Sequence, residues 1–270
     1  MNLQIFWRIL KDKKVSLIAY VLGAIATVEM YIALFPAIRD QAEQLNQMMA
    51  AFPKGFMEAF GFNGSEALFS RVESYMSTEY FSFFWPIMAV TMVIAFANLM
   101  IVTEVERGTI ELTLAQPVSR LKLFFSRYLA GAFYFLVFDL ASIFVMIPIA
   151  KLNHVAYQAE NYFTITGISL LFGLSIFSIA AFFSALFSEK GKATAMSTAL
   201  LLGMYVLNIV ATLKDSVKNI RYASLFYYFN PSTVFANNEV IQYSVPVFIG
   251  VIVIFTAAAA WWFNRRDIAV

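Results

Sequence analysis

"TEVERGTIELTLAQPVSRLKLFFSRYLAG", residues 103–131, is a charged, turn-containing stretch that separates two long apolar segments of the chain. The segment before it covers about residues 80–102 and the segment after it about residues 124–150. A helix of roughly 20 mostly apolar residues crosses the hydrocarbon core of a bilayer. The quoted stretch therefore predicts a structured polar connection between two membrane-spanning helices.

The composition of the whole chain indicates an integral membrane protein. Of the 270 residues, 61% are hydrophobic and only 13% are charged, whereas soluble domains have about 45–50% apolar and about 25% charged residues. Only helices and closed barrels satisfy their own backbone hydrogen bonds in lipid, and barrel strands alternate over segments of about 10 residues. The longer runs here predict an all-α fold that is surrounded by membrane lipid and has no nucleic-acid partner.

Six apolar runs are long enough to span a membrane, and we expect residues 1–270 to form a single domain. The predicted spans are residues 15–36, 80–102, 124–150, 162–187, 193–213 and 245–263. Placing both termini in the cytoplasm puts twelve of the 19 Lys and Arg residues in the shorter inner segments, as the positive-inside rule requires. The sequence thus predicts a multi-pass protein of the cytoplasmic membrane.

The remaining segments are predicted to be short helices. Residues 1–14 place Leu3, Phe6, Trp7 and Leu10 on one helical face, which favours an amphipathic helix on the inner surface. Residues 37–79 read as amphipathic helices at the outer interface, interrupted by Pro53 and by a turn at residues 61–64. The aromatic residues 214–244 predict short outer helices before the last span, one of them capped by Ser232 or Thr233.

The sequence offers little for catalysis or for binding a cofactor. It has no cysteine and one histidine, His154, which cannot form a zinc site alone. The closest approach to a nucleotide-binding P-loop is Gly191-Lys192, but Ala193 follows it and Leu186 stands where the first glycine is needed. We expect no catalytic residue, no metal site and no ATP site in this chain, although an intramembrane enzyme remains an alternative.

Four polar residues lie within the predicted spans: Glu29, Asn98, Asp139 and Asn208. Carboxylates in a bilayer usually face a bundle interior or water, so Glu29 and Asp139 are candidates for a polar lining or a substrate contact. Alternatively, both are packing residues that are hydrogen-bonded or protonated, because such residues look the same in a sequence. Asn98 and Asn208 suit interhelical hydrogen bonds.

The stretch between the second and third spans has the signals of two short helices joined at an angle, and we call residues 103–120 the elbow. Gly108 supplies a turn, Thr109 can cap a helix, and Glu111 suits the positive end of that helix. Pro117 ends it, and Ser119 can cap the third span. A loop that only obeys the positive-inside rule would not need three glutamates or a capped apolar segment.

The elbow resembles the signature of the ABC-2 family of transporter permeases. That signature has the form Glu-x-Glu-x-Gly-Thr-hydrophobic-Glu-x-Leu-Leu, followed by Pro-hydrophobic-Ser-Arg. The matching positions are Glu104, Glu106, Gly108, Thr109, Glu111, Leu112, Leu114, Pro117, Ser119 and Arg120. Thr113 stands between the two leucines, where the family often has a leucine pair.

The resemblance implies that the elbow is a coupling helix that docks on a separate cytoplasmic ATPase, where an apolar face of Ile110, Leu112 and Leu114 would fill a pocket. The implied coupling residues are Glu104, Glu106, Arg107, Gly108, Thr109, Glu111, Leu112, Pro117 and Arg120. It further implies short re-entrant helices on the outer side before the last span. It also implies two ATPase subunits, which bind the ATP and Mg²⁺, and a second permease that is either a copy or a paralogue. Export of a hydrophobic or amphipathic peptide, drug or lipid-like compound is the expected function. The alternatives are sodium export, maturation of a metal centre, or a membrane channel or scaffold without an ATPase.

Overall fold

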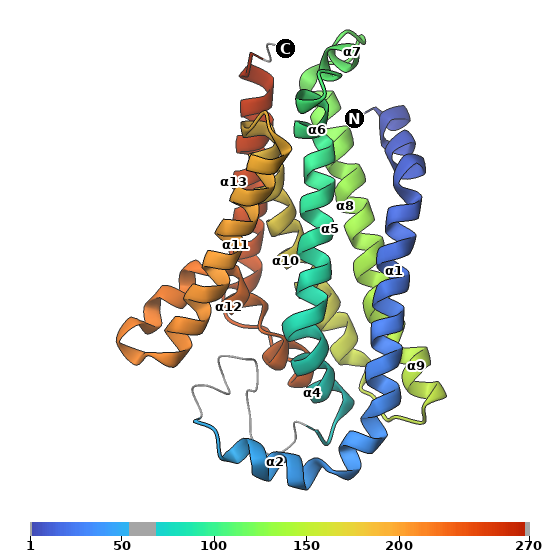
Figure 1. Ribbon diagram of the computed structural model, residues 1–270, viewed down its shortest axis with the longest axis vertical. Helices are drawn as coiled ribbons and strands as arrows, with labels where there is room; N and C mark the ends of the chain where they lie inside the picture. Colours follow the sequence, from blue (N-terminus) through green and yellow to red (C-terminus); the bar gives the residue numbers. More distant parts are fainter. Residues whose placement is uncertain (1, 54–68, 268–270) are drawn as a thin grey trace.

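The computed structural model describes residues 2–53 and 69–267, and these residues form helices and no strand (Figure 1). In chain order the elements are α1 (Leu3–Asp40), α2 (Ala42–Ala50), α4 (Val72–Met76), the π-helix η1 (Ser77–Phe84), α5 (Trp85–Met100), α6 (Val102–Glu106), α7 (Ile110–Leu114), α8 (Arg120–Phe144), α9 (Met146–Leu152), α10 (Ala159–Leu186), α11 (Lys190–Leu213), the 3-10 helix η2 (Asp215–Ala223), α12 (Leu225–Phe229), the π-helix η3 (Ser232–Ala236) and α13 (Ser244–Arg265).

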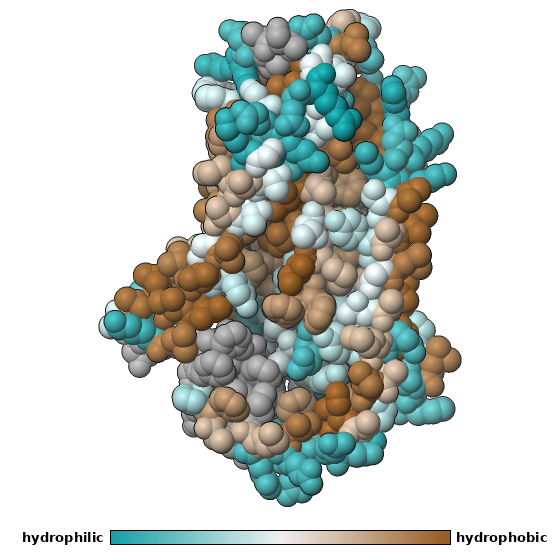
Figure 2. All heavy atoms as spheres, in the orientation of Figure 1, coloured by the Kyte–Doolittle hydropathy of each residue, from teal (hydrophilic) through white to brown (hydrophobic). Residues whose placement is uncertain are grey.

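The prediction of six membrane-spanning segments is confirmed. Within the described residues, six helical segments are long and apolar enough to cross a membrane: Leu3–Asp40, Val72–Met100, Arg120–Leu152, Ala159–Leu186, Lys190–Leu213 and Ser244–Arg265. The start of α1, the end of α13, and α6 with α7 all lie at one end of the bundle, which we call the elbow end (Figure 1). Polar residues gather at this end and over α2 at the opposite end, and apolar residues cover much of the surface between them (Figure 2).

The second span begins eight residues before the predicted Tyr80, because polar residues at its start are satisfied inside the protein. Glu73 is 2% exposed, and its carboxylate accepts a hydrogen bond from the backbone N–H of Gln158. Ser77 and Thr78 both donate to the carbonyl of Ser74. Hydropathy alone places such residues outside a span, whereas local and tertiary hydrogen bonds allow them within one.

The first fourteen residues do not form a separate surface helix. Instead, α1 is one continuous helix from Leu3 to Asp40 that begins at Asn2, whose side chain caps it. The sequence has no glycine before Gly23 and no proline before Pro36, so nothing interrupts the backbone hydrogen bonds between the amphipathic start and the span. The predicted boundary between a helix of residues 1–14 and the first span is therefore wrong.

The core of the bundle is centred on α10, which packs against α5, α8, α11 and α13. Its most apolar window is 72% buried, the highest share among the six spans. Two glycines allow α8 and α10 to approach closely. A Cβ at Gly131 on α8 would lie 2.3 Å from the ring of Phe177, and a Cβ at Gly173 on α10 would lie 1.9 Å from the ring of Phe135. Each helix thus accommodates a phenylalanine of the other over a glycine.

The connections at the opposite end are partly as predicted. An amphipathic helix, α2, follows α1, and Pro53 lies beyond its end; the predicted turn at residues 61–64 lies outside the described residues. Residues 214–244 form η2, α12 and η3, and Pro231 stands at the cap position before η3. Neither Ser232 nor Thr233 is the cap, because both lie within η3; the Asn230 Oδ1 accepts instead from the backbone N–H of Thr233 at 3.2 Å.

The fifth span differs from the others in how little of it the rest of the chain covers. α11 leans away from the bundle, so that its lower half and η2 project from the molecule (Figure 1). This projecting part is largely apolar on its surface (Figure 2). Only 17% of the most apolar window of α11 is buried, so lipid or another protein must cover the remainder.

Candidate functional site: the elbow

The turn between α6 and α7 is built around Gly108, which has a φ of 67°. The N–H of Gly108 donates to the carbonyl of Val105 at 3.1 Å, and the N–H of Thr109 donates to the carbonyl of Glu104 at 2.9 Å. This pair of bonds defines a Schellman motif, in which glycine is favoured at the left-handed position. The predicted turn at Gly108 is confirmed.

Thr109 does not act as the predicted side-chain cap of α7. Its hydroxyl lies 3.4 Å from the carbonyl of Glu104, so it belongs to the end of α6 rather than to the start of α7. The Schellman motif holds Thr109 at φ −90° and ψ −5°, whereas a capping residue usually has extended backbone angles. Threonine is a suitable residue type for a helix cap, but the preceding turn gives Thr109 backbone angles that do not suit a cap.

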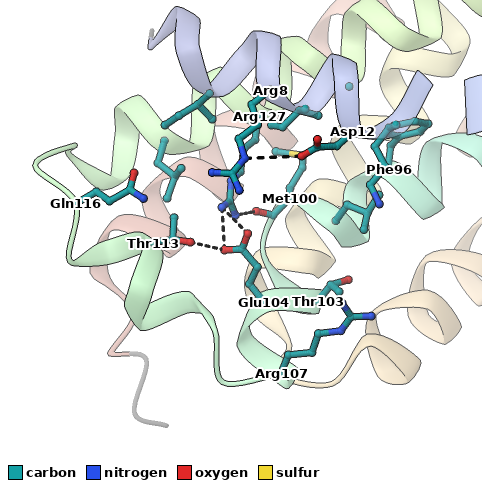
Figure 3. A pocket seen from close by; sticks show the side chains of 16 residues that line it. Arg8, Asp12, Phe96, Met100, Thr103, Glu104, Arg107, Thr113, Gln116 and Arg127 are labelled. Carbon is teal, nitrogen blue, oxygen red and sulfur yellow. Dashed lines mark hydrogen bonds and ion pairs between the residues drawn. The ribbon is translucent and has the colours of Figure 1, made fainter. Parts of the chain in front are cut away.

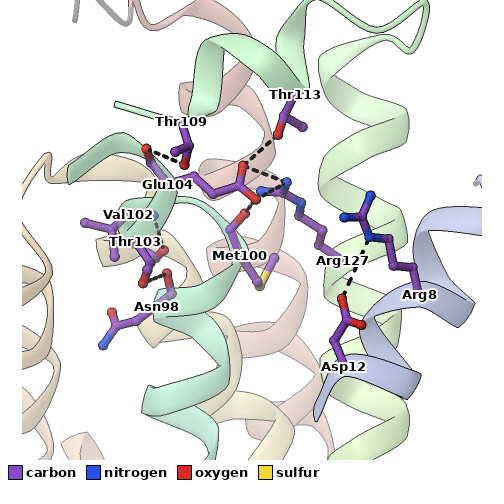
Figure 4. Close-up of polar contacts among 11 residues, drawn as sticks. Arg8, Asp12, Asn98, Met100, Val102, Thr103, Glu104, Thr109, Thr113 and Arg127 are labelled. Atoms are coloured by element: carbon purple, nitrogen blue, oxygen red, sulfur yellow. Dashed lines mark hydrogen bonds and ion pairs between the residues drawn. The ribbon is translucent and has the colours of Figure 1, made fainter. Parts of the chain in front are cut away.

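Glu104 faces the inside of the elbow and anchors it to α8 (Figure 4). Arg127 Nη2 lies 2.7 Å from Oε1 and 2.8 Å from Oε2 of Glu104, so both carboxylate oxygens accept from one guanidinium nitrogen of the ion pair. The other guanidinium nitrogen, Nη1, donates to the carbonyl of Met100 at the end of α5. The Thr113 hydroxyl on α7 donates to Glu104 at 3.0 Å. One carboxylate and one guanidinium thus connect α5, α6, α7 and α8.

The apolar residues of α7 do not share one face. Ile110 is fully buried and Leu114 is half-buried against the core, whereas Leu112 is 74% exposed. The sequence grouped these three as one surface for a partner. In a helix of five residues, positions two apart point in different directions, so Ile110 and Leu114 hold α7 in place and Leu112 is presented to the outside.

Glu106, Arg107 and Glu111 have different surroundings from Glu104. The Glu106 carboxylate accepts a hydrogen bond at 3.2 Å from the backbone N–H of Lys190, the first residue of α11. This contact places a negative charge at the positive end of a spanning helix. Arg107 and Glu111 are both exposed, and the described residues include no ion-pair partner for either one.

The second half of the elbow leads into α8 as predicted. The short helix α7 ends at Leu114, before the exposed Pro117, since the residue ahead of a proline disfavours helical angles. The Ser119 side chain accepts from the N–H of Lys122 at 3.4 Å and caps α8. Both features of the predicted break are confirmed.

At the elbow end, Arg120 and Arg266 donate hydrogen bonds to backbone carbonyls of other segments, which the sequence did not indicate. Arg120 donates to the carbonyl of Arg266 at 2.6 Å and to that of Phe263 at 3.4 Å, so it pairs with the negative end of α13. Arg266 donates to the carbonyls of Ala185 at 2.7 Å and Phe187 at 2.9 Å, at the end of α10. Burial lowers the pKa of the Arg266 guanidinium. The resemblance had implied a coupling role for Arg120, whereas nothing in the sequence had indicated the contacts of Arg266.

Two of the four polar residues within the spans make interhelical contacts. Asn98 on α5 donates to the Thr194 hydroxyl on α11 at 2.8 Å, as expected for hydrogen-bonding between helices. Asp139 on α8 is fully buried and accepts from the Ser169 hydroxyl on α10 at 2.6 Å; its second oxygen has no hydrogen-bond partner among the described residues. Asp139 therefore lies in the bundle interior and joins α8 to α10.

The other two lie away from the interior. Glu29 is exposed on α1 because the buried face of this helix is formed by Ala24, Val28, Tyr31, Ile32 and Phe35. Glu29 therefore does not line the interior of this chain. Asn208 is half-buried on α11, and the described residues give its side chain no hydrogen bond, contrary to the prediction.

Among the described residues, no group of three or more His, Cys, Asp or Glu side chains could hold a metal ion. The fold and the elbow instead define a class: a multi-pass helical membrane protein with a braced, partly exposed polar element at one end. The family model for the ABC-2 family transporter proteins matches residues 3–268. The chain therefore belongs to this family and is a permease, the membrane subunit of an ABC transporter. No curated protein and no solved structure matches the chain.

Proposed function

We propose that this permease couples ATP hydrolysis by a separate ATPase to the export of an amphipathic substrate, and that the elbow is where the ATPase docks. One observation carries the proposal: the elbow is fixed from within by Glu104, Thr113 and Ile110, yet presents Leu112 outward with 74% exposure. Leu112 lies at the polar end of the bundle, where a docked protein would remove its apolar side chain from water. ATP and Mg²⁺ would bind to the ATPase.

The elbow end is the cytoplasmic side in this proposal. The cations of the start of α1, the elbow, the α10–α11 connection and the end of α13 all lie there, in agreement with the positive-inside rule. Both termini would then be cytoplasmic and the protein would lie in the cytoplasmic membrane. The projecting part of α11 with η2 would lie toward the outer side.

The complete transporter would contain two permeases and two ATPases. Two features of this chain support a second permease. The first is α11, which is only 17% buried in its apolar window. The second is Glu29, a carboxylate on the exposed face of a spanning helix, where charge facing lipid is costly. A second copy or a paralogue would cover such surfaces, and Glu29 would then border the space between the two permeases.

The substrate class follows from the surfaces available. The exposed face of α1 around Glu29 carries Ile18, Leu22, Met30 and Leu34, so a path along it would suit an amphipathic molecule with a cationic or polar group. Peptides, drugs and lipid-like compounds have this character. Sodium ions and intermediates of metal-centre maturation are the alternatives to include as test substrates.

The docking part of the proposal is tested by site-specific photo-crosslinking in membranes that contain the permease and its candidate partner ATPase. A crosslinker at Leu112 should form an adduct with the ATPase. One at Leu152, a leucine that is 77% exposed at the opposite end, should not. Equal yields from both positions, or none from position 112, would rule out docking at the elbow.

The transport part is tested in proteoliposomes that contain the same two proteins. ATP-dependent movement should be followed for an amphipathic peptide, a lipophilic drug, a fluorescent lipid and sodium ions. Movement of any of the first three supports the proposal. Movement of sodium alone would replace the substrate class while leaving the coupling role intact.

A further inference from the structure

A cavity of about 310 Å³ lies at the elbow end between α1, the end of α5, the elbow and α8 (Figure 3). The ion pair between Arg127 and Glu104 forms part of its wall, and Gln116 lies at the elbow side. Its apolar wall is formed by Ile5, Ile9, Phe96, Leu99, Met100 and Leu123. The cavity is thus apolar toward the bundle and charged toward the elbow end, and its volume is at the lower end of the range of ligand sites.

The charges that line this cavity do not balance. Arg127 is paired with Glu104, and Arg8 lies 3.8 Å from Asp12 in an exposed pair. The other two cations of the lining are Lys13 and Arg107, and the described residues contain no ion-pair partner for either. The lining therefore carries an excess of two positive charges, which favours an anion.

The position of the cavity along the bundle matches the level of lipid headgroups. Trp7 and Leu3, both more than half exposed, lie on the outer surface of α1, and Trp7 is within two turns of Lys13. Tryptophan concentrates where hydrocarbon meets the polar headgroups, and cations at the ends of spanning helices extend toward the same layer. The ligand best suited to a half-apolar, half-cationic cavity at this depth is an anionic amphiphile.

We propose that this cavity binds the headgroup of an anionic phospholipid from the inner leaflet, with its phosphate between Lys13 and the rim at Arg107 and the start of its acyl chains against Ile9 and Leu99. Cationic pockets between spanning helices on the cytoplasmic side are suited to such headgroups. The proposal goes beyond the coupling role and uses only the orientation given above. A lipid bound there contacts α1 and the elbow together and holds one against the other.

Native mass spectrometry of the purified permease without an ATPase tests this proposal, so its result does not depend on transport. Phosphatidylglycerol and phosphatidylcholine are added in equal amounts, and the bound lipid is counted. The matched variants are Lys13→Gln and Lys14→Gln, which are neighbours on α1 with the same change of charge, although only Lys13 lines the cavity. A cation near a headgroup contributes enough for an effect of about fivefold on affinity.

The expected result is preferential retention of phosphatidylglycerol that falls about fivefold in Lys13→Gln and is unchanged in Lys14→Gln. A third variant, Ile9→Trp, fills the apolar part without altering charge and should reduce retention as well. Equal retention by the two lysine variants would overturn the proposal. So would displacement of the lipid by glycerol 3-phosphate or inorganic phosphate alone, because the site would then bind a free phosphate group rather than a lipid.

Discussion

The inward and outward faces of the elbow use similar residue types for opposite purposes. On the inward face, Glu104 is paired with Arg127, and Ile110 is fully buried. On the outward face, Glu111 is exposed without an ion-pair partner among the described residues, and Leu112 is 74% exposed. A glutamate and an aliphatic residue thus hold the elbow in place on its inward face, and another such pair is available to a partner on its outward face. Substitutions on the two faces should therefore fail in different ways.

The largest effect is expected from Arg127→Met, which removes the anchor of the inward face. The substitution leaves the Glu104 carboxylate and the Met100 carbonyl without their charged donor. Breaking a buried ion pair in this way costs about 3–5 kcal/mol, and the lower end applies because the Glu104 side chain keeps 30% exposure. The midpoint of thermal unfolding in detergent should fall clearly.

The control for this prediction is the double variant Arg127→Met with Glu104→Leu. Removing both charges leaves no unpaired carboxylate, so much of the stability should return. A double variant that is as unstable as the sum of the two single variants would show that the pair itself does not hold the elbow.

The second prediction concerns the turn that separates the two faces. Gly108→Val forces a branched side chain into the left-handed region, at a cost of about 1–2 kcal/mol or more. Gly191→Ala is the matched control, since a Cβ there meets nothing within 4 Å; it should be neutral or slightly stabilising. Thermal unfolding of both variants checks the prediction, and an equal loss in both would refute it.

The third prediction concerns Leu112 on the outward face. Leu112→Ser should leave stability within about 0.5 kcal/mol of the wild type, because the side chain is exposed. It should weaken ATPase binding about tenfold, which corresponds to a loss of about 1.4 kcal/mol of binding free energy. Titration of the ATPase onto the permease in nanodiscs measures this, and Leu152→Ser, equally exposed at the opposite end, should bind as the wild type does.

The smallest effect is expected from Glu106→Gln, at the contact between the elbow and α11. The amide can still accept from the N–H of Lys190, but the charge at the helix end is lost. This interaction is typically worth about 0.3–1 kcal/mol and is weakened by salt. The loss of stability relative to the wild type should therefore shrink at high ionic strength, and a loss that does not depend on salt would argue against a charge effect.

The sequence predicted the elements of the elbow well and the directions of its side chains poorly. Six apolar runs, Gly108, Pro117 and Ser119 encode spans, a turn, a break and a cap through local rules, and all of these were found. The pairing of Glu104 with Arg127 depends on how α8 packs against the elbow, which no local rule contains. The same is true of Arg266, whose partners lie about 80 residues away in the chain.

The intramembrane residues show the same limit. Glu29 and Asp139 look alike as carboxylates in apolar runs, yet one is exposed on α1 and the other is fully buried against α10. Hydropathy locates a span, but the rotation of that span about its axis follows from packing with distant helices. The phase of α1 could have been inferred from the spacing of Ala24, Val28, Ile32 and Phe35, which places Glu29 on another side.

The start of α1 and the end of α13 lie beside the elbow (Figure 1), and this arrangement makes the permease suited to gene fusion. An ATPase joined by a short flexible linker beyond either helix would start on the side where we propose that it docks, with no need for an added membrane crossing. Its local concentration at the elbow would reach the millimolar range. A fusion should therefore restore coupling in Leu112→Ser, where only binding of the ATPase is weakened. It should not restore coupling in Arg127→Met, where the structure of the elbow is lost, so the fusion distinguishes the two causes.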